Sequence, residues 1–186
     1  AGIALRRIQA EPARAALGRA MRAARATGIA SLTAEVDRAR GALDAPAVRL
    51  IAREATRLLG LAEVEVLIRS DALVVDACRN TVRAGAVVIP LARRPVLFAL
   101  ARALAEAWPE DAPRETLLAR AFRAREADDS HRARLRVEIG RLRRAFGPLA
   151  GVSATRRGFL LRPHRTRTVA VLAPPAEGDH AEVLAL

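Results

Sequence analysis

The chain has 186 residues, of which 52% are hydrophobic, so it is long enough for one domain or two small ones with a buried core. Its formal net charge is +12, and every basic residue is an arginine. No apolar run reaches the roughly 18 residues of a membrane span, and the N-terminus lacks the apolar core of a secretory signal, so we expect a soluble, cytoplasmic protein.

The positive charge is concentrated in the C-terminal part of the chain. Residues 130–167 hold eleven arginines and one acidic residue, Glu138. A local cluster of this kind is typical of proteins that bind nucleic acid, although an anionic membrane surface or an acidic protein would attract it too.

The first predicted domain, residues 1–62, is a small antiparallel helical region. Apolar periodicity predicts helices over 11–27 and 31–43, and a third helix opened by Asp44 and Pro46 that ends at Gly60. Short loops between alanine-rich helices are typical of the end of a tetratricopeptide-like array, but also of a bespoke bundle or a dimerisation module. We therefore keep a homodimer formed through these helices as a candidate assembly.

The second predicted domain, residues 63–163, begins with short β-branched runs. The stretches EVEVLIRS, LVVDACRN and TVRAGAVVIPL are separated by turn-forming residues, which predicts three or four small strands. Pro95 then opens an apolar-periodic helix that Pro109 stops, and a second helix begins at Pro113 and runs to about residue 122.

A strongly basic helix over 130–146 and a β-hairpin complete this domain. The helix carries one apolar face, and the hairpin is predicted from GVSATRRGFLLRP, with Arg156, Arg157 and Gly158 at its turn. The remaining residues, 164–186, are expected to be extended, with a strand over 168–172. The final HAEVLAL looks like the first turns of a further helix, so we expect the chain to be a piece of a longer protein.

The helix over 130–146 has two chemically distinct faces. Four apolar residues share the face that we expect to be buried: Leu135, Ile139, Leu142 and Phe146. Small or apolar residues occupy the centre of the opposite face, and arginines surround them. Such a surface can enter a major groove, with guanidinium groups reaching guanine edges or phosphates. A charged helix face that is merely solvated is the simpler alternative.

The order of short strands, three helices with the last one basic, and a hairpin with a basic turn resembles the OmpR-type winged-helix family of bacterial transcription regulators. The resemblance covers residues 73–163. It is carried by LVVDACRNTVRAGAVVIPL, PRETLLARAF, VEIGRLRRAF and ATRRGFLLRP. It implies an α+β fold, mostly helical: a winged helix-turn-helix with an N-terminal strand platform and a C-terminal β-hairpin wing.

The resemblance also implies which arginines contact DNA. Arg141 and Arg143 match contact positions of the family's recognition helix, and Arg134 matches a polar contact position. Together with the charge pattern this predicts a DNA-binding set of Arg132, Arg134, Arg136, Arg141, Arg143, Arg144, Arg156, Arg157 and Arg114. The family's receiver domain is not expected, because the preceding 70 residues are too short and too helical.

Several residues differ from the family's pattern, so the resemblance does not predict which bases the helix would contact. Glu138 stands where the family often has histidine, Gly140 replaces an arginine, and the usual wing positions hold Ser153 and Thr155. Glu138 could accept a hydrogen bond from a cytosine amino group or pair with a neighbouring arginine. Likewise Arg114, at the start of its helix, could hold a phosphate with the helix amides or remain in solvent.

The sequence predicts neither an enzyme nor a cofactor. No phosphate-binding loop, nucleophile elbow or paired-cysteine motif is present, and the three histidines lack metal-ligand spacing. Cys78 is expected to be a small core or near-core residue.

Two functions follow. The first is a transcription regulator that binds double-stranded DNA, with RNA polymerase as a further candidate partner and no membrane. The alternative is a winged helix used for protein interaction or oligomerisation, with weak, nonspecific binding of nucleic acid.

Overall fold

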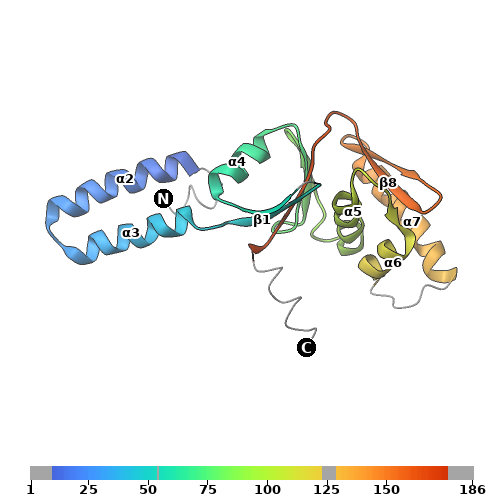
Figure 1. Ribbon diagram of the computed structural model, residues 1–186, viewed down its shortest axis with the longest axis horizontal. Helices are drawn as coiled ribbons and strands as arrows, with labels where there is room; N and C mark the ends of the chain where they lie inside the picture. The colour runs from blue at the N-terminus through green and yellow to red at the C-terminus, as the bar shows by residue number, and fades with distance from the viewer. Residues whose placement is uncertain (1–9, 54, 123–128, 176–186) are drawn as a thin grey trace. The chain divides into compact units, whose positions relative to one another are not determined.

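The structure is a computed structural model that describes residues 10–53, 55–122 and 129–175 (Figure 1). The described residues form six helices, a six-stranded mixed sheet and a three-stranded antiparallel sheet, so the predicted α+β class is confirmed. They divide into two compact units. The helical unit comprises 10–49, 58–67 and Pro175, and the sheet unit comprises 50–53, 55–57 and 68–174.

Two antiparallel helices, α2 (Ala10–Thr27) and α3 (Ala30–Asp44), make up most of the helical unit (Figure 1). The turn between them is at Gly28, whose φ of 70° suits a residue without a side chain. The face of α2 predicted from periodicity is buried, with Leu17 packed against Leu43 of α3. The first two predicted helices are therefore confirmed.

The third predicted helix is wrong. Residues 44–60 instead contain strands β1 (Val48–Ala52) and β2 (Ala55–Leu59). Their apolar spacing fits a helical period, but β1 lies between β2 and a strand from the far end of the chain, and the Ala47 amide donates to the Leu59 carbonyl at 2.8 Å. Pairing with a remote strand overrides the local helical pattern.

The strand predicted at EVEVLIRS is also wrong, because this segment is helix α4 (Leu61–Arg69). The Glu63 carboxylate accepts a hydrogen bond from the Gly60 amide at 3.0 Å, which caps the first turn. Val64 and Glu65 are buried, and the Glu65 carboxylate accepts from the Ala10 amide at 2.8 Å. The alternating Glu and Val residues imitate a strand, but burial follows the helical period.

The six-stranded sheet has the order β2-β1-β9-β3-β4-β5. Its remaining strands are β3 (Leu73–Asp76), β4 (Thr81–Ala84), β5 (Val87–Pro90) and β9 (Val169–Ala173). The predicted strand over 168–172 is thus confirmed as β9, which runs parallel to β3 with Val171 opposite Val75. All five residues of β9 are buried, as expected of an interior strand.

The turn after β3 is closed by Asp76, whose buried carboxylate accepts from the Cys78 and Arg79 amides at 2.9 and 3.1 Å. Cys78 lies in this turn and is exposed, so its predicted place in or near the core is wrong. A capped turn faces solvent because the strands on either side of it leave the core there.

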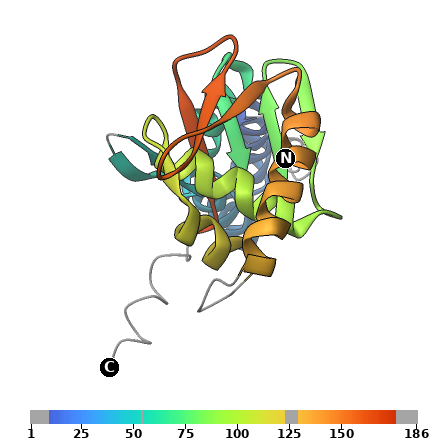
Figure 2. The same ribbon diagram turned by 90° about the vertical axis from the view of Figure 1, so that its right-hand side faces the viewer.

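The other helices and the hairpin of the sheet unit occur in the predicted order, and the short strand β6 (Ala112–Pro113) was not predicted. The predicted elements are α5 (Pro95–Ala107), α6 (Arg114–Phe122), α7 (Asp129–Phe146), β7 (Ala150–Ala154) and β8 (Gly158–Pro163). Figure 2 looks onto the three helices, with strands of the large sheet behind them. In the small sheet β8 is central, between β6 and β7.

Helix α5 lies at the centre of the main core. It contacts β3 and β9 of the large sheet, α6, α7 and the central strand of the small sheet. Leu100 and Ala101 of α5 are completely buried in this cluster, and Trp108 packs against it at the helix end. The core therefore fixes the position of α7 relative to the β7–β8 hairpin. The predicted C-terminal helix HAEVLAL lies outside the described residues.

Candidate nucleic-acid interface

Helix α7 buries its apolar face and exposes its arginines, as its sequence predicts. The side chains of Leu135, Ile139, Leu142 and Phe146 are at most 2% exposed and belong to the main core. All six arginines of the helix are exposed. On the same outer surface Ala133 is exposed, and Val137 is 54% exposed although it is apolar.

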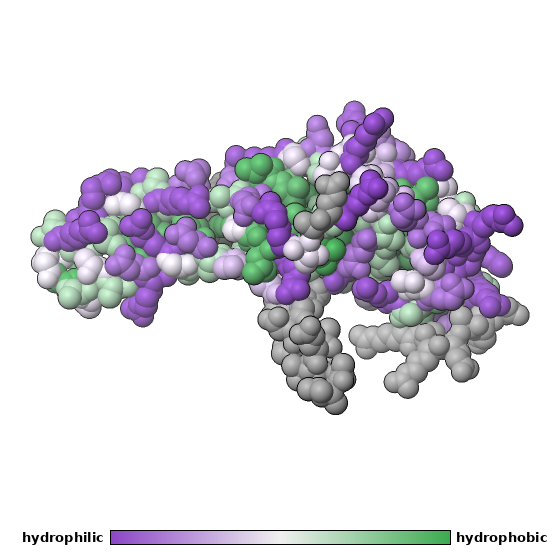
Figure 3. Space-filling view, in the orientation of Figure 1, coloured by the Kyte–Doolittle hydropathy of each residue, from purple (hydrophilic) through white to green (hydrophobic). Residues whose placement is uncertain are grey.

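The turn of the β7–β8 hairpin adds two exposed arginines, Arg156 and Arg157. We call the eight exposed arginines of α7 and this turn the arginine face: Arg132, Arg134, Arg136, Arg141, Arg143, Arg144, Arg156 and Arg157. Figure 3 shows hydrophilic side chains gathered at the end of the sheet unit that carries α7 and the small sheet. The positive charge of the arginine face attracts a polyanion.

One flank of α7 forms a groove with the hairpin. The groove has a volume of about 400 Å³, and Leu135, Ile139 and Phe159 contribute apolar side chains to its lining. Four arginines also line it: Arg114, Arg132, Arg136 and Arg143. Positive charge from α6 and α7 is thus brought together beside the hairpin, although α6 and β8 are more than 30 residues apart in the chain.

Arg143 ties α7 to the hairpin. Its Nε donates to the Val152 carbonyl of β7 at 2.6 Å, while the side chain stays at the surface. A guanidinium group has five N–H donors, so this bond leaves others for a ligand. Arg143 therefore combines a structural bond with a place on the arginine face.

Arg114 holds the hairpin turn from the other side. Its Nη1 and Nη2 donate to the carbonyls of Arg156 and Thr155 at 2.7 and 3.0 Å, and its guanidinium carbon lies 5.7 Å from the centre of the Phe159 ring. Its backbone amide donates to the Arg157 carbonyl. These bonds engage part of the Arg114 guanidinium and its own amide, and contact of Arg114 with DNA stays a prediction.

Two further residues organise the turn, and the sequence analysis did not single them out for this role. The Thr155 hydroxyl donates to the Asp111 carboxylate at 2.5 Å and accepts from the Gly158 amide at 2.8 Å. Asp111 also lies 4.0 Å from Nη1 of Arg157, whose side chain remains 75% exposed. Asp111 lies just before β6 and α6, and its partner Thr155 is 44 residues away in the chain. Nothing in the local sequence therefore indicates its role.

Arg134 and Arg141 of α7 contact side chains of helices α6 and α7. The guanidinium carbon of Arg134 lies 4.7 Å from the centre of the Phe122 ring. Nη1 of Arg141 lies 2.7 Å from the Glu138 carboxylate, and the Glu138 residue is only 8% exposed. Of the two alternatives for Glu138, the structure thus shows pairing with a neighbouring arginine. The other alternative was a hydrogen bond from a cytosine amino group.

Within the arginine face, three side chains are the most available donors. Within the described part of the chain, no hydrogen bond or ion pair engages the side chain of Arg136, Arg144 or Arg156, and all three are exposed. Arg162, just beyond the predicted set, is exposed too, with its Nε donating to the Ser153 hydroxyl at 2.8 Å.

No protein-family model, curated protein or solved structure matches the chain. Among the described residues, no helix is long and apolar enough to cross a membrane. The same residues contain no cluster of three His, Cys, Asp or Glu side chains that could hold a metal ion.

Proposed function

We propose that this chain is a bacterial transcription regulator that binds double-stranded DNA through a winged helix. In this proposal α7 is the recognition helix and the β7–β8 hairpin is the wing. One observation carries it: exposed arginines extend from α7 to the hairpin turn, a bond from Arg143 joins α7 to the hairpin, and bonds from Arg114 of α6 hold the turn. A major groove is wide enough for a helix, and an 18-residue helix is about 27 Å long.

The available arginines suggest how contacts are divided. Arg136, Arg144 and Arg156 neutralise phosphates, because their donors are not used within the described chain. The outer surface of α7 between them is formed by small or apolar side chains, Ala133 and Val137 among them, which permits close approach and contact with thymine methyl groups. The hairpin turn then reaches the adjacent minor groove.

The OmpR-type resemblance of residues 73–163 supports the same reading of strands, three helices and hairpin. It extends the proposal to a cytoplasmic protein that meets RNA polymerase at a promoter. The α2–α3 pair is the proposed site of homodimer formation, with Ile29 50% exposed at its turn.

The proposal is tested by fluorescence anisotropy with a labelled random duplex at two salt concentrations. We expect the double variant Arg136→Ala and Arg144→Ala to lose at least about tenfold in affinity and to lower the salt slope by about 2, since each phosphate contact contributes about 1. The control, Arg38→Ala in α3, removes an exposed arginine outside the arginine face. Equal affinity of the double variant and the control would reject α7 as the DNA-binding helix.

A second candidate function is protein interaction, and the exposure of Val137 favours it. Val137 shares the outer surface of α7 with the exposed Ala133, and together they would form a small apolar seam for a partner. In that case, association of the chain with itself or with a partner protein survives high salt, whereas binding of DNA does not. Sedimentation of the chain in about 1 M salt, compared with Val137→Asp, distinguishes the two functions.

A further inference from the structure

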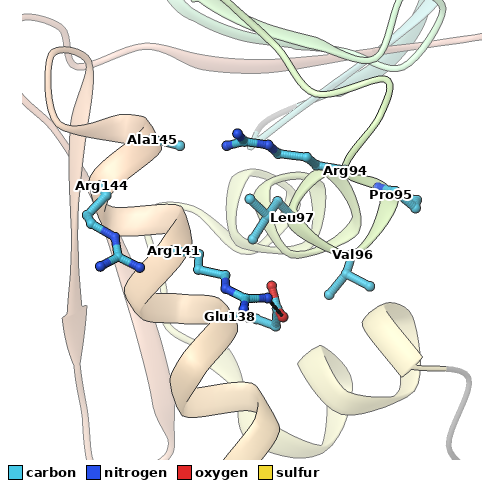
Figure 4. Close-up of a pocket in the computed structure, with 8 residues that line it drawn as sticks. All are labelled: Arg94, Pro95, Val96, Leu97, Glu138, Arg141, Arg144 and Ala145. Atoms are coloured by element: carbon cyan, nitrogen blue, oxygen red, sulfur yellow. Dashed lines mark hydrogen bonds and ion pairs between the residues drawn. The ribbon is translucent and has the colours of Figure 1, made fainter.

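A pocket of about 670 Å³ lies between the start of α5 and the C-terminal half of α7, on the opposite flank of α7 from the groove beside the hairpin. Its basic lining residues are Arg94, Arg141 and Arg144, and its acidic one is Glu138. In Figure 4 the Arg94 side chain extends from the start of α5 toward α7, and Arg141 bends toward Glu138. The pocket thus combines the guanidinium groups of Arg94 and Arg141 with one carboxylate, and Arg144 lines its edge on α7.

The net charge of this lining favours an anion. Glu138 is nine-tenths buried, and its carboxylate is already paired with Arg141 at 2.7 Å. The Arg141 side chain is still 56% exposed, so it keeps donors for a ligand, and Arg94 and Arg144 are exposed as well. Guanidinium groups bind phosphate oxygens through paired N–H donors, which makes a phosphate group the best match.

The remaining lining is apolar. Pro95, Val96 and Leu97 of α5 and Ala145 of α7 supply it, and Leu97 points toward α7 between Arg94 and Arg141 (Figure 4). An apolar wall beside basic groups suits a molecule with a phosphate at one end and a flat or apolar body at the other. The volume lies in the range of about 300–1,000 Å³ that is usual for small-molecule sites.

We propose that this pocket binds a small phosphorylated organic molecule of the nucleotide class, and that the bound molecule lowers the affinity of the chain for DNA. The second part rests on the proposed function, because Arg141 and Arg144 line the pocket and also belong to the arginine face. Phosphates of the ligand and of DNA compete for these two residues. By linkage, DNA weakens the binding of the ligand by the same factor.

Isothermal titration calorimetry of the full chain tests the pocket directly. The probes are a panel of ribonucleoside 5′-diphosphates, the corresponding uncharged nucleosides, pyrophosphate and inorganic phosphate. We expect a diphosphate nucleotide to bind more tightly than pyrophosphate, because only the nucleotide uses the apolar wall, and the nucleosides not to bind. Equal affinity for pyrophosphate and for every nucleotide would overturn the assignment to an organic ligand, as would a lack of binding by all of them.

Two variants separate the pocket from the DNA-binding surface. Arg94→Ala removes a pocket residue that is not part of the arginine face, and we expect it to weaken the nucleotide at least tenfold while the affinity for DNA stays unchanged. Arg136 lies on the other flank of α7, so Arg136→Ala should weaken DNA binding and leave the nucleotide affinity unchanged. Arg94→Lys, which keeps the charge, should retain part of the nucleotide affinity. Equal nucleotide affinity of Arg94→Ala and Arg136→Ala would overturn the proposed pocket.

Competition completes the test. Saturating nucleotide should lower the DNA affinity of the unaltered chain but not that of Arg94→Ala. If DNA binds and no nucleotide does, this inference fails and the proposed function stands. If a nucleotide binds through Arg94 and DNA does not bind, the pocket is correct and the proposed function fails.

Discussion

Several surface arginines of the sheet unit act inside the protein as well as at its surface. Arg143 donates to a carbonyl of β7, Arg114 donates to two carbonyls of the hairpin turn, and Arg141 pairs with a nearly buried Glu138. Arg114 is the least replaceable by lysine, because it donates to two carbonyls at once from one planar guanidinium.

Arg143 and Arg136 lie in the same groove but should respond differently to removal. Arg143→Ala is expected to lower the free energy of unfolding by about 1 kcal/mol, because the Val152 carbonyl loses a charged donor, and also to weaken DNA binding. Arg136→Ala should weaken DNA binding without changing stability. Thermal unfolding followed by circular dichroism, together with anisotropy, measures both quantities. An unchanged midpoint for Arg143→Ala would show that its bond to β7 contributes nothing.

The small sheet depends on a close approach at Gly158. A Cβ atom there would lie 1.8 Å from the Ala112 carbonyl oxygen and 3.0 Å from Cα of Pro113, so β6 could not remain paired with β8. Because β8 is the central strand, the turn with Arg156 and Arg157 depends on this contact. The hairpin is thus positioned by backbone packing as well as by the arginine bonds.

Gly158→Ala is therefore expected to destabilise the sheet unit by at least about 3 kcal/mol, since the clash is with backbone atoms that cannot rotate away. The matched control is Gly140→Ala in α7, where an added Cβ meets nothing within 4 Å. That substitution should stabilise the helix by about 0.5–1 kcal/mol. Chemical denaturation of the two variants tests the contrast, and similar midpoints would contradict it.

At the scale of the whole molecule, the charge distribution governs association. The net charge of +12 is concentrated in 130–167. In the proposed binding mode, α7 and the hairpin turn contact the same duplex. Charges farther than about 8–10 Å from the duplex are screened at physiological salt, so the arginines that contact it should set the DNA affinity.

Salt dependence measures this directly. With about six phosphate contacts, the logarithm of the binding constant should fall against the logarithm of the salt concentration with a slope near −5. Titrations of a duplex at four or five salt concentrations give the slope. A slope near zero, with association that persists at high salt, would favour the protein-interaction alternative.

The sequence by itself determined the elements whose information is local. The two faces of α7 follow from the spacing of Leu135, Ile139 and Leu142, and the β7–β8 turn follows from ATRRGF. The α2–α3 pair and the strands β3 to β5 follow from periodicity and from turns at Gly28 and Gly85. In each case side chains close in sequence decide which face is buried.

Only the tertiary structure decided the rest. The sequence predicts the wrong secondary structure for β1, β2 and α4, because their burial depends on distant parts of the chain. Strand β9 pairs with β1, and the Ala10 amide bonds to Glu65 of α4. The tertiary structure also decided which arginines bond the hairpin, which pair with Glu138 and which remain available. A pattern of charge shows that a surface is basic, whereas the partners of each guanidinium depend on carbonyls and carboxylates that folding brings within about 3 Å.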